Sequence, residues 1–156
     1  MSGKHETITE TSDRRIVSKR LFAAPRERLF AAWSEPEQLK LWWGPTGFTN
    51  TFHVFEFHPG GSWNIIMHGP DGADYKNDSV FVEIVRPERI VFDHLSMPHF
   101  RMTATFAETE GGTELVWRMD FATAADFERV KGYVVEGNRQ NFVRLAAHLE
   151  KSLNAV

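Results

Sequence analysis

Leu41-Trp42-Trp43-Gly44-Pro45 closes a short amphipathic segment and leads directly into a turn. Two further turn sequences, Gly60-Gly61-Ser62-Trp63 and Gly69-Pro70-Asp71-Gly72, each lie beside an apolar stretch that is typical of a strand. Large aromatic residues beside breaks in the backbone favour a curved wall over a flat one. These stretches therefore predict the shape of the protein more clearly than they predict an activity.

The composition is that of a globular domain with an unusually aromatic interior. The chain has 156 residues, of which 42% are hydrophobic and 25% are charged. This length favours one domain with a sizeable core. The 13 phenylalanines and 5 tryptophans, against 2 tyrosines, predict a large interior that could be hollow. A formal net charge of -3 gives no electrostatic case for binding nucleic acid.

The chain contains no cysteine, so disulfides and thiolate chemistry are excluded. Its first residues include Lys4, His5 and Glu6 and do not resemble a signal peptide. No apolar run approaches the roughly 18 residues that cross a bilayer. We therefore expect a cytoplasmic protein without a membrane span, present as a monomer or a homodimer.

The N-terminal third of the chain predicts a strand followed by two short helices. Residues 1–13 are polar and rich in Thr and Ser, so we expect a flexible segment there and one domain over residues 14–153. A strand at residues 16–22 precedes a helix that begins near Pro25. We expect Ser34 to cap the second helix in a capping box. This helix should end at Gly44-Pro45.

The rest of the chain predicts a meander and a long helix. Six stretches separated by turn residues are typical of strands, at residues 51–57, 61–68, 75–85, 89–95, 100–108 and 113–121. Short connections favour antiparallel pairing. Residues 126–153 have a helical pattern, with an expected break near Gly132. The predicted fold class is α+β, with a curved antiparallel sheet of about six or seven strands around the C-terminal helix.

Several sequence markers are similar to those of one known family. They are Trp42-Trp43-Gly44-Pro45, Gly60-Gly61-Ser62-Trp63, Pro70-Asp71-Gly72, Glu83-Ile84, Pro87-Glu88-Arg89-Ile90, Gly111-Gly112-Thr113 and Glu136-Gly137. Over residues 14–152 the chain resembles the activator of Hsp90 ATPase homologue 1-like family of the START-like (SRPBCC) superfamily. The resemblance implies a helix-grip fold. It implies no single activity, because the superfamily includes lipid carriers, polyketide cyclases and partner-binding domains. Ser79 departs from the family pattern, since relatives often carry glycine there.

The predicted site is a cavity between the sheet and the long helix. The candidate ligand-binding residues are Trp42, Trp43, Trp63, Ile65, Met67, His94, Met102, Phe106, Trp117, Met119, Val134, Asn138, Asn141 and Phe142. The alternative is a dry core that these aromatic side chains fill completely. Asn138 and Asn141 lie on an apolar stripe of the helix. Their amides would need a ligand, a water molecule or a neighbouring protein group as partner.

No set of residues predicts a reaction. The 7 histidines lack the spacing of a helical zinc site, and no Gly-x-Ser-x-Gly elbow is present. Asp93 and His94 are neighbours in a strand and so point to opposite faces. We therefore expect no catalytic residue, no metal and no cofactor.

Three functional hypotheses follow. The leading one is non-catalytic binding of a small apolar or aromatic molecule, oriented by Asn141 and His94. The second, implied by the family resemblance, is contact with a protein partner such as an Hsp90-type chaperone. The third is a cyclase- or hydrolase-like enzyme that uses His94 or Glu83 in the same cavity, and a group with a perturbed pKa inside the cavity would favour it.

Overall fold

Eight strands and three helices make up residues 6–154, the part of the chain that the computed structural model describes. The strands are β1 (Ile8–Ser12), β2 (Arg15–Phe22), β3 (Thr49–Phe55), β4 (Ser62–His68), β5 (Asp74–Val85), β6 (Arg89–His94), β7 (Phe100–Thr109) and β8 (Gly112–Phe121). The helices are α1 (Arg26–Ser34), α2 (Pro36–Trp42) and α3 (Ala124–Asn154). This arrangement confirms the predicted α+β helix-grip fold.

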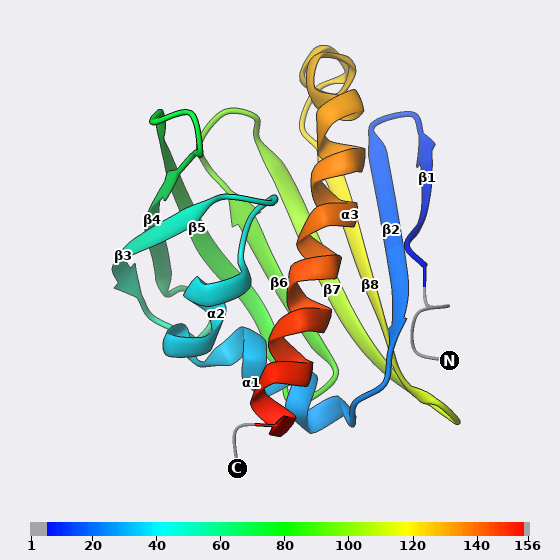
Figure 1. The fold of residues 1–156 in the computed structure, drawn as a ribbon. Helices are drawn as coiled ribbons and strands as arrows, with labels where there is room; N and C mark the ends of the chain where they lie inside the picture. The colour runs from blue at the N-terminus through cyan, green and yellow to red at the C-terminus, as the bar shows by residue number, and fades with distance from the viewer. Residues whose placement is uncertain (1–5, 155–156) are drawn as a thin grey trace.

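The strands form one sheet in the order β1-β2-β8-β7-β6-β5-β4-β3, and all neighbouring pairs are antiparallel. Strands β3 to β8 follow one another across the sheet, which confirms the predicted meander. The sheet curves around α3, and α1 and α2 lie at its lower end (Figure 1). β3 starts and ends two residues earlier than predicted, because the turn toward β4 already begins at Glu56.

The N-terminal edge of the sheet corrects the sequence analysis. Residues 8–12 belong to β1 rather than to a flexible segment, and they pair with β2 in the register Ile8↔Lys19 to Ser12↔Arg15. Most β1 side chains are exposed, so the strand lacks the alternation that marks a half-buried strand. Backbone pairing, rather than burial, holds this edge. Residues 1–5 of the expected flexible segment lie outside the described residues.

The start of α2 also differs from the prediction. Ser34 is the last residue of α1, and Glu35 occupies the N-cap position of α2. Pro36 follows at the first helical position, where a missing backbone N–H costs nothing. The side-chain amide of Gln38 donates to Oε1 of Glu35 at 2.8 Å. The predicted capping box on Ser34 is therefore wrong, because the proline moves the helix start by one residue.

Helix α3 runs without a break through Gly132. The backbone N–H of Asp126 donates to the hydroxyl of Thr123 at 3.1 Å, so a threonine caps the helix. Val130, in the turn before Gly132, is fully packed against the sheet side of the helix. Tertiary packing of this kind outweighs the cost of about 1 kcal/mol for glycine in a helix.

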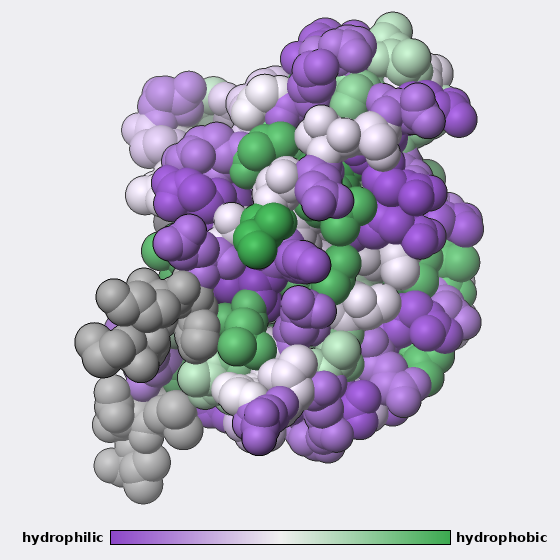
Figure 2. All heavy atoms as spheres, turned by 90° about the vertical axis from the view of Figure 1, so that its right-hand side faces the viewer, coloured by the Kyte–Doolittle hydropathy of each residue, from purple (hydrophilic) through white to green (hydrophobic). Residues whose placement is uncertain are grey.

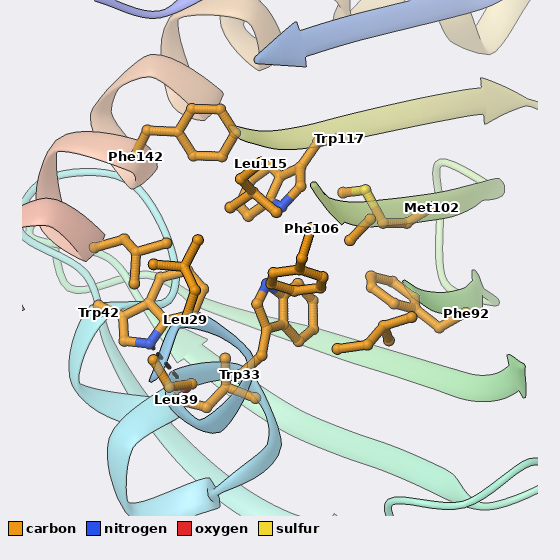
Figure 3. Close-up of a cluster of buried hydrophobic side chains, with 14 of the residues drawn as sticks. Leu29, Trp33, Leu39, Trp42, Phe92, Met102, Phe106, Leu115, Trp117 and Phe142 are labelled. Atoms are coloured by element: carbon orange, nitrogen blue, oxygen red, sulfur yellow. Dashed lines mark hydrogen bonds between the residues drawn. The ribbon is translucent and has the colours of Figure 1, made fainter. Parts of the chain in front are cut away.

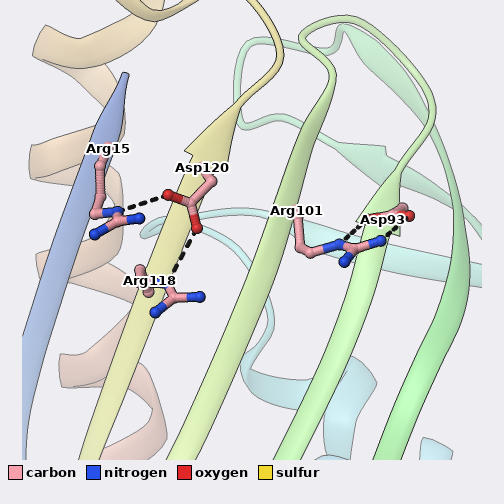
Figure 4. A network of polar contacts seen from close by, with 5 residues as sticks. All are labelled: Arg15, Asp93, Arg101, Arg118 and Asp120. Atoms are coloured by element: carbon pink, nitrogen blue, oxygen red, sulfur yellow. Dashed lines mark hydrogen bonds and ion pairs between the residues drawn. The ribbon is translucent and has the colours of Figure 1, made fainter. Parts of the chain in front are cut away.

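The outer face of the sheet carries ion pairs within and between neighbouring strands (Figure 4). Asp120 accepts hydrogen bonds from Arg15 at 2.6 Å and from Arg118 at 3.0 Å. On the next pair of strands, Arg101 donates to Asp93 at 2.7 Å. These charged groups point away from α3, so the inner face is left to apolar side chains.

The surface is mixed in character on the side that carries β1. Figure 2 shows hydrophilic side chains over most of this face, with apolar ones interspersed among them. Within residues 6–154, no helix is both long enough and apolar enough to span a membrane.

Candidate functional site

A cavity of about 760 Å³ lies between the inner face of the sheet and residues 133–141, near the middle of α3. Strands β4 to β8, the loop after α2 and the loop between β6 and β7 also contribute to its wall. The C-terminal half of α3 instead packs through Phe142, Leu145 and Leu149 on a filled core. Phe127 and Val130, nearer the start of α3, are also buried in the core, so the cavity interrupts an otherwise filled space under the helix.

The floor of the cavity is a row of side chains on neighbouring strands. Trp63 in β4 pairs with Ser79 in β5, Ser79 pairs with His94 in β6, and His94 pairs with Phe100 in β7. Residues opposite each other on antiparallel strands point to the same face of the sheet. The strand register therefore brings two polar side chains into an otherwise aromatic floor.

One face of α3 forms the roof. Val134, Gly137, Asn138 and Asn141 line the cavity at spacings of three and four residues, which places them on one side of the helix. A Cβ atom added to Gly137 would lie 3.6 Å from Cγ of Pro45, an ordinary contact distance. Glycine at this position is therefore not required by crowding, and its missing side chain leaves space for the cavity.

The loop after α2 is clamped to α3 by one arginine. The guanidinium of Arg144 donates to the carbonyl oxygens of Leu41 (3.0 Å), Trp43 (3.1 Å), Gly44 (3.0 Å) and Pro45 (2.9 Å). These carbonyls include the orphan acceptors at the C-terminal end of α2. Arg144 therefore fixes the loop that brings Trp43 and Pro45 to the cavity.

Two further contacts define the path of this loop. Gly44 has a φ of 101°, and a Cβ atom there would lie only 2.9 Å from Cε of Met67. Glycine is the residue that adopts such a φ without strain. The amide of Asn50 donates to the carbonyl oxygens of Lys40 at 3.1 Å and Trp43 at 3.0 Å. The loop is therefore held from the α3 side and from β3.

A tryptophan cluster closes the inner end of the cavity. The ring of Trp43 lies 5.1 Å from that of Trp63, 5.2 Å from that of Trp33 and 5.4 Å from that of Trp117, measured between centroids. The rings meet edge-on or tilted, which is the favoured geometry for aromatic pairs. Figure 3 shows Trp33 and Trp117 within the buried cluster, with Trp42 at its α2 side.

His94 is the one ionisable side chain deep in this wall among the described residues. Its Nδ1 donates to the carbonyl oxygen of Pro98 at 2.8 Å, and its Nε2 lies 2.6 Å from Oδ1 of Asn77. The ring also stacks on Phe100 at 4.7 Å between centroids. Burial lowers the pKa of His94 below its ordinary value of 6.5, more than the hydrogen bonds to backbone carbonyls raise it. Both ring nitrogens therefore lie against protein groups, the carbonyl of Pro98 and the side-chain amide of Asn77.

The mouth of the cavity carries apolar side chains that face water. Tyr133 in α3 is 67% exposed, Met97 in the β6–β7 loop is 62% exposed, and Tyr75 in β5 is 46% exposed. All three line the opening, together with the charged side chains of Asp74 and Lys76. The rim therefore combines large apolar groups with one charge of each sign.

The structure brings most of the predicted ligand-binding residues together around this cavity. Those that line it are Trp43, Trp63, Ile65, Met67, His94, Met102, Trp117, Met119, Val134, Asn138 and Asn141. Trp42, Phe106 and Phe142 do not, because they are buried in the filled core. The indole nitrogen of Trp42, for example, donates to the carbonyl oxygen of Ala32 inside that core at 3.1 Å.

Several lining residues were absent from the sequence prediction. They are Gly44, Pro45, Phe48, Asp74, Tyr75, Lys76, Asn77, Ser79, Phe92, Met97, Pro98, Phe100, Tyr133 and Gly137. Asn77 and Ser79 alternate with Phe81 along β5 and so could have been placed on its inner face. Their polarity made them resemble solvent-facing positions.

The residues suggested for an enzyme do not assemble into an acid–base pair. Glu83 is exposed on the surface, where Arg89 donates to it at 2.8 Å, and this hydrogen bond lowers the pKa of Glu83. It does not line the cavity that contains His94. Among the described residues, no group of three or more His, Asp or Glu side chains is placed to hold a metal ion.

Solved structures of similar shape come from several bacteria. A crystal structure of a Rhodobacter sphaeroides protein is 28% identical, with a TM-score of 0.85, and covers 94% of this chain and 99% of its own. A solution structure of an Arthrobacter aurescens protein is 24% identical, with a TM-score of 0.86, and covers 96% and 94%. A Nitrosomonas europaea protein, at 19% identity and a TM-score of 0.82, covers 92% and 98%.

A comparison with curated proteins finds no match. The family model described as activator of Hsp90 ATPase homolog 1-like protein matches residues 23–150. This match spans both short helices, β3 to β8 and most of α3, and so includes the whole cavity wall. The chain therefore belongs to the activator of Hsp90 ATPase homolog 1-like family.

Proposed function

We propose that this protein binds a small apolar or aromatic molecule in the cavity under α3 and does not transform it. The observation that carries the proposal is the volume of about 760 Å³ behind a largely apolar wall. Small-molecule sites typically enclose roughly 300–1,000 Å³ and combine apolar walls with a few polar groups. Trp63, Trp117 and Met102 supply the wall, and Asn138, Asn141 and Ser79 supply the polar groups.

Binding without chemistry is favoured by the state of the polar groups. Both nitrogens of His94 face protein groups, the carbonyl of Pro98 and the side-chain amide of Asn77, so neither is directed at a bound molecule in this arrangement. Asp74 and Lys76 lie exposed at the rim rather than inside the cavity. General acid–base catalysis needs a group within hydrogen-bond reach of the reacting atom.

A matched pair of glycine substitutions tests the proposal. Gly137→Leu places a side chain in the cavity, whereas Gly132→Leu places the same side chain in open space on the same helix. We expect Gly137→Leu to weaken binding of the neutral fluorescent probe N-phenyl-1-naphthylamine by at least about tenfold. Gly132→Leu should leave its affinity unchanged. Both variants should be at least as stable as the parent, because leucine favours a helix by up to about 1 kcal/mol over glycine.

The NMR signals of the tryptophan indole groups show where the probe binds. Titration by NMR should shift the indole resonances of Trp43, Trp63 and Trp117, which line the cavity. The indole of Trp42 is bonded inside the core and should not move. No saturable binding of the probe, or equal binding by both leucine variants, would contradict the proposal.

A second candidate is contact with a protein partner, and the exposed rim of Tyr75, Met97 and Tyr133 favours it. The family description points to an Hsp90-type chaperone as the partner to test. The Gly137→Leu variant also distinguishes the two candidate functions. Gly137→Leu alters the interior and leaves the rim, so it should weaken small-molecule binding but leave any effect on the chaperone ATPase rate unchanged.

A further inference from the structure

The polar groups that α3 presents to the cavity are hydrogen-bond acceptors. Nδ2 of Asn141 donates to the carbonyl oxygen of Trp42 at 2.7 Å, and a carbonyl can only accept, so this contact sets the amide orientation. Nδ2 of Asn138 donates to Oγ of Ser18 at 3.1 Å and also contacts Sδ of Met119 at 3.5 Å. Both amide nitrogens are thus used within the protein, and no described residue donates to either Oδ1 atom.

These two amides are largely removed from water. Asn141 is 4% exposed and Asn138 is 8% exposed, and both line the cavity from the same face of α3. A buried amide oxygen without a donor is unfavourable. An apolar ligand that fills the cavity would leave both oxygens in that state. A ligand that carries an O–H or N–H group would satisfy them.

The interior offers nothing to balance a negative charge. Asp74 and Lys76 are exposed at the rim, and His94 is the ionisable side chain inside among the described residues. Burial lowers the pKa of His94, so its ring is mainly neutral at neutral pH. A carboxylate or phosphate brought inside would lose its hydration without meeting a cation. The cavity is therefore suited to an uncharged ligand.

We propose that the ligand is a neutral aromatic molecule with a hydroxyl or amine group that donates to Oδ1 of Asn138 or Asn141. This inference rests on the proposed function, because it specifies the class of ligand for the same cavity. The ring packs against the aromatic wall of Trp63 and Trp117, and the donor group faces α3. A phenol is the simplest molecule of this class.

Four probes of one ring system test the inference on the unaltered protein. Calorimetric titration at neutral pH compares naphthalene, 2-methoxynaphthalene, 2-naphthol and 2-naphthoate. They carry, respectively, no polar group, an acceptor only, a donor and a negative charge. We expect 2-naphthol to bind about tenfold more tightly than 2-methoxynaphthalene. We expect 2-naphthoate to bind more weakly than naphthalene.

The outcomes separate this inference from the proposed function. Binding of naphthalene with equal affinities for 2-naphthol and 2-methoxynaphthalene would overturn the donor requirement and leave the binding function intact. Tightest binding of 2-naphthoate would overturn the neutral class. If none of the four probes binds, the proposed function fails and the inference fails with it.

A substitution locates the acceptor. Asn141→Leu should reduce the preference for 2-naphthol over 2-methoxynaphthalene to less than about twofold while naphthalene still binds. Naphthalene binding shows that the cavity is intact in the variant. If loss of the Trp42 contact prevents Asn141→Leu from folding, Asn138→Leu replaces it as the test variant. The control is Gln140→Leu, which removes an amide that lies outside the cavity and contacts Glu136 and the backbone N–H of Thr46; it should keep the full preference. A full preference in both asparagine variants would overturn the inference.

Discussion

At the scale of single residues, burial decides what His94 can do. The pKa of His94 is lowered mainly by burial, with a smaller contribution from the nearby charge of His99, while Pro98, Ser96 and Asp78 act in the opposite direction. A lowered pKa means that the unfolded chain binds the proton more readily than the folded one. The stability of the fold should therefore fall as the pH drops below the unfolded value of 6.5.

We predict that the free energy of unfolding is lower at about pH 5.5 than at about pH 7.5, and that His94→Asn reduces this difference. Asparagine can still place an amide N–H near the carbonyl of Pro98 but does not titrate. Urea denaturation at both pH values measures the effect. His148, whose pKa burial also lowers, contributes in the same direction in both proteins and keeps some dependence on pH.

The control is His58→Asn, since His58 is exposed in the turn before β4. It should show the same pH dependence as the parent protein. An unchanged difference between the two pH values in His94→Asn would mean that His94 does not titrate differently in the folded and unfolded states.

At the scale of elements, a single side chain joins α3 to the end of α2. Arg144 donates to four carbonyl oxygens between Leu41 and Pro45, whereas Arg139, on the same helix, pairs with Glu136 on the exposed surface. Hydrogen bonds from a charged group to partly buried carbonyls contribute more than an exposed ion pair. The two arginines therefore provide a matched comparison.

We predict that Arg144→Met lowers the free energy of unfolding by about 2–4 kcal/mol, because the carbonyls at the end of α2 lose their donor. Arg139→Met should cost less than about 1 kcal/mol. Thermal and urea unfolding of the two variants measure both values. Equal losses would mean that the clamp contributes no more than a surface ion pair. Since Arg144 also positions Trp43, the probe affinity should fall in the first variant alone.

At the scale of the whole molecule, the space under α3 is partly filled core and partly cavity. Phe142 packs in the filled core at 4.5 Å from Trp117, measured between ring centroids, and is fully buried. Phe100 lies on the cavity wall and is only partly buried. The same substitution at the two positions therefore tests this description.

We predict that Phe142→Ala costs about 3–5 kcal/mol of stability, as expected for loss of a packed core ring. Phe100→Ala should cost about 1–2 kcal/mol, because the cavity side of this ring already lacks packing partners. Urea denaturation in the absence of ligand measures both. Equally large losses would indicate that the cavity is closed by repacked side chains in solution.

Local periodicity in the sequence was sufficient to predict most helices and strands and their order along the chain. Alternation along β4 placed Trp63, Ile65 and Met67 on one face, and the structure puts all three on the cavity side. The same rule separated Asp93 from His94, and Asp93 indeed pairs with Arg101 on the outer face. Such patterns are readable because neighbouring side chains in a strand must point to opposite faces. The sequence analysis did not predict β1, because neither face of this strand is buried and its sequence therefore lacks an alternating apolar pattern.

The sequence by itself determined the α+β class, the meander, the long C-terminal helix and an inner face rich in aromatic residues. Only the tertiary structure decided which of those residues meet a cavity. Trp42 and Trp43 are neighbours, yet one is bonded inside the core and the other lines the cavity. Asn141 and Phe142 are also neighbours, and Asn141 lines the cavity whereas Phe142 lies in the core. The division depends on where α1 and α2 fill the space beneath α3, and this contact between distant segments has no local periodicity from which it could be predicted.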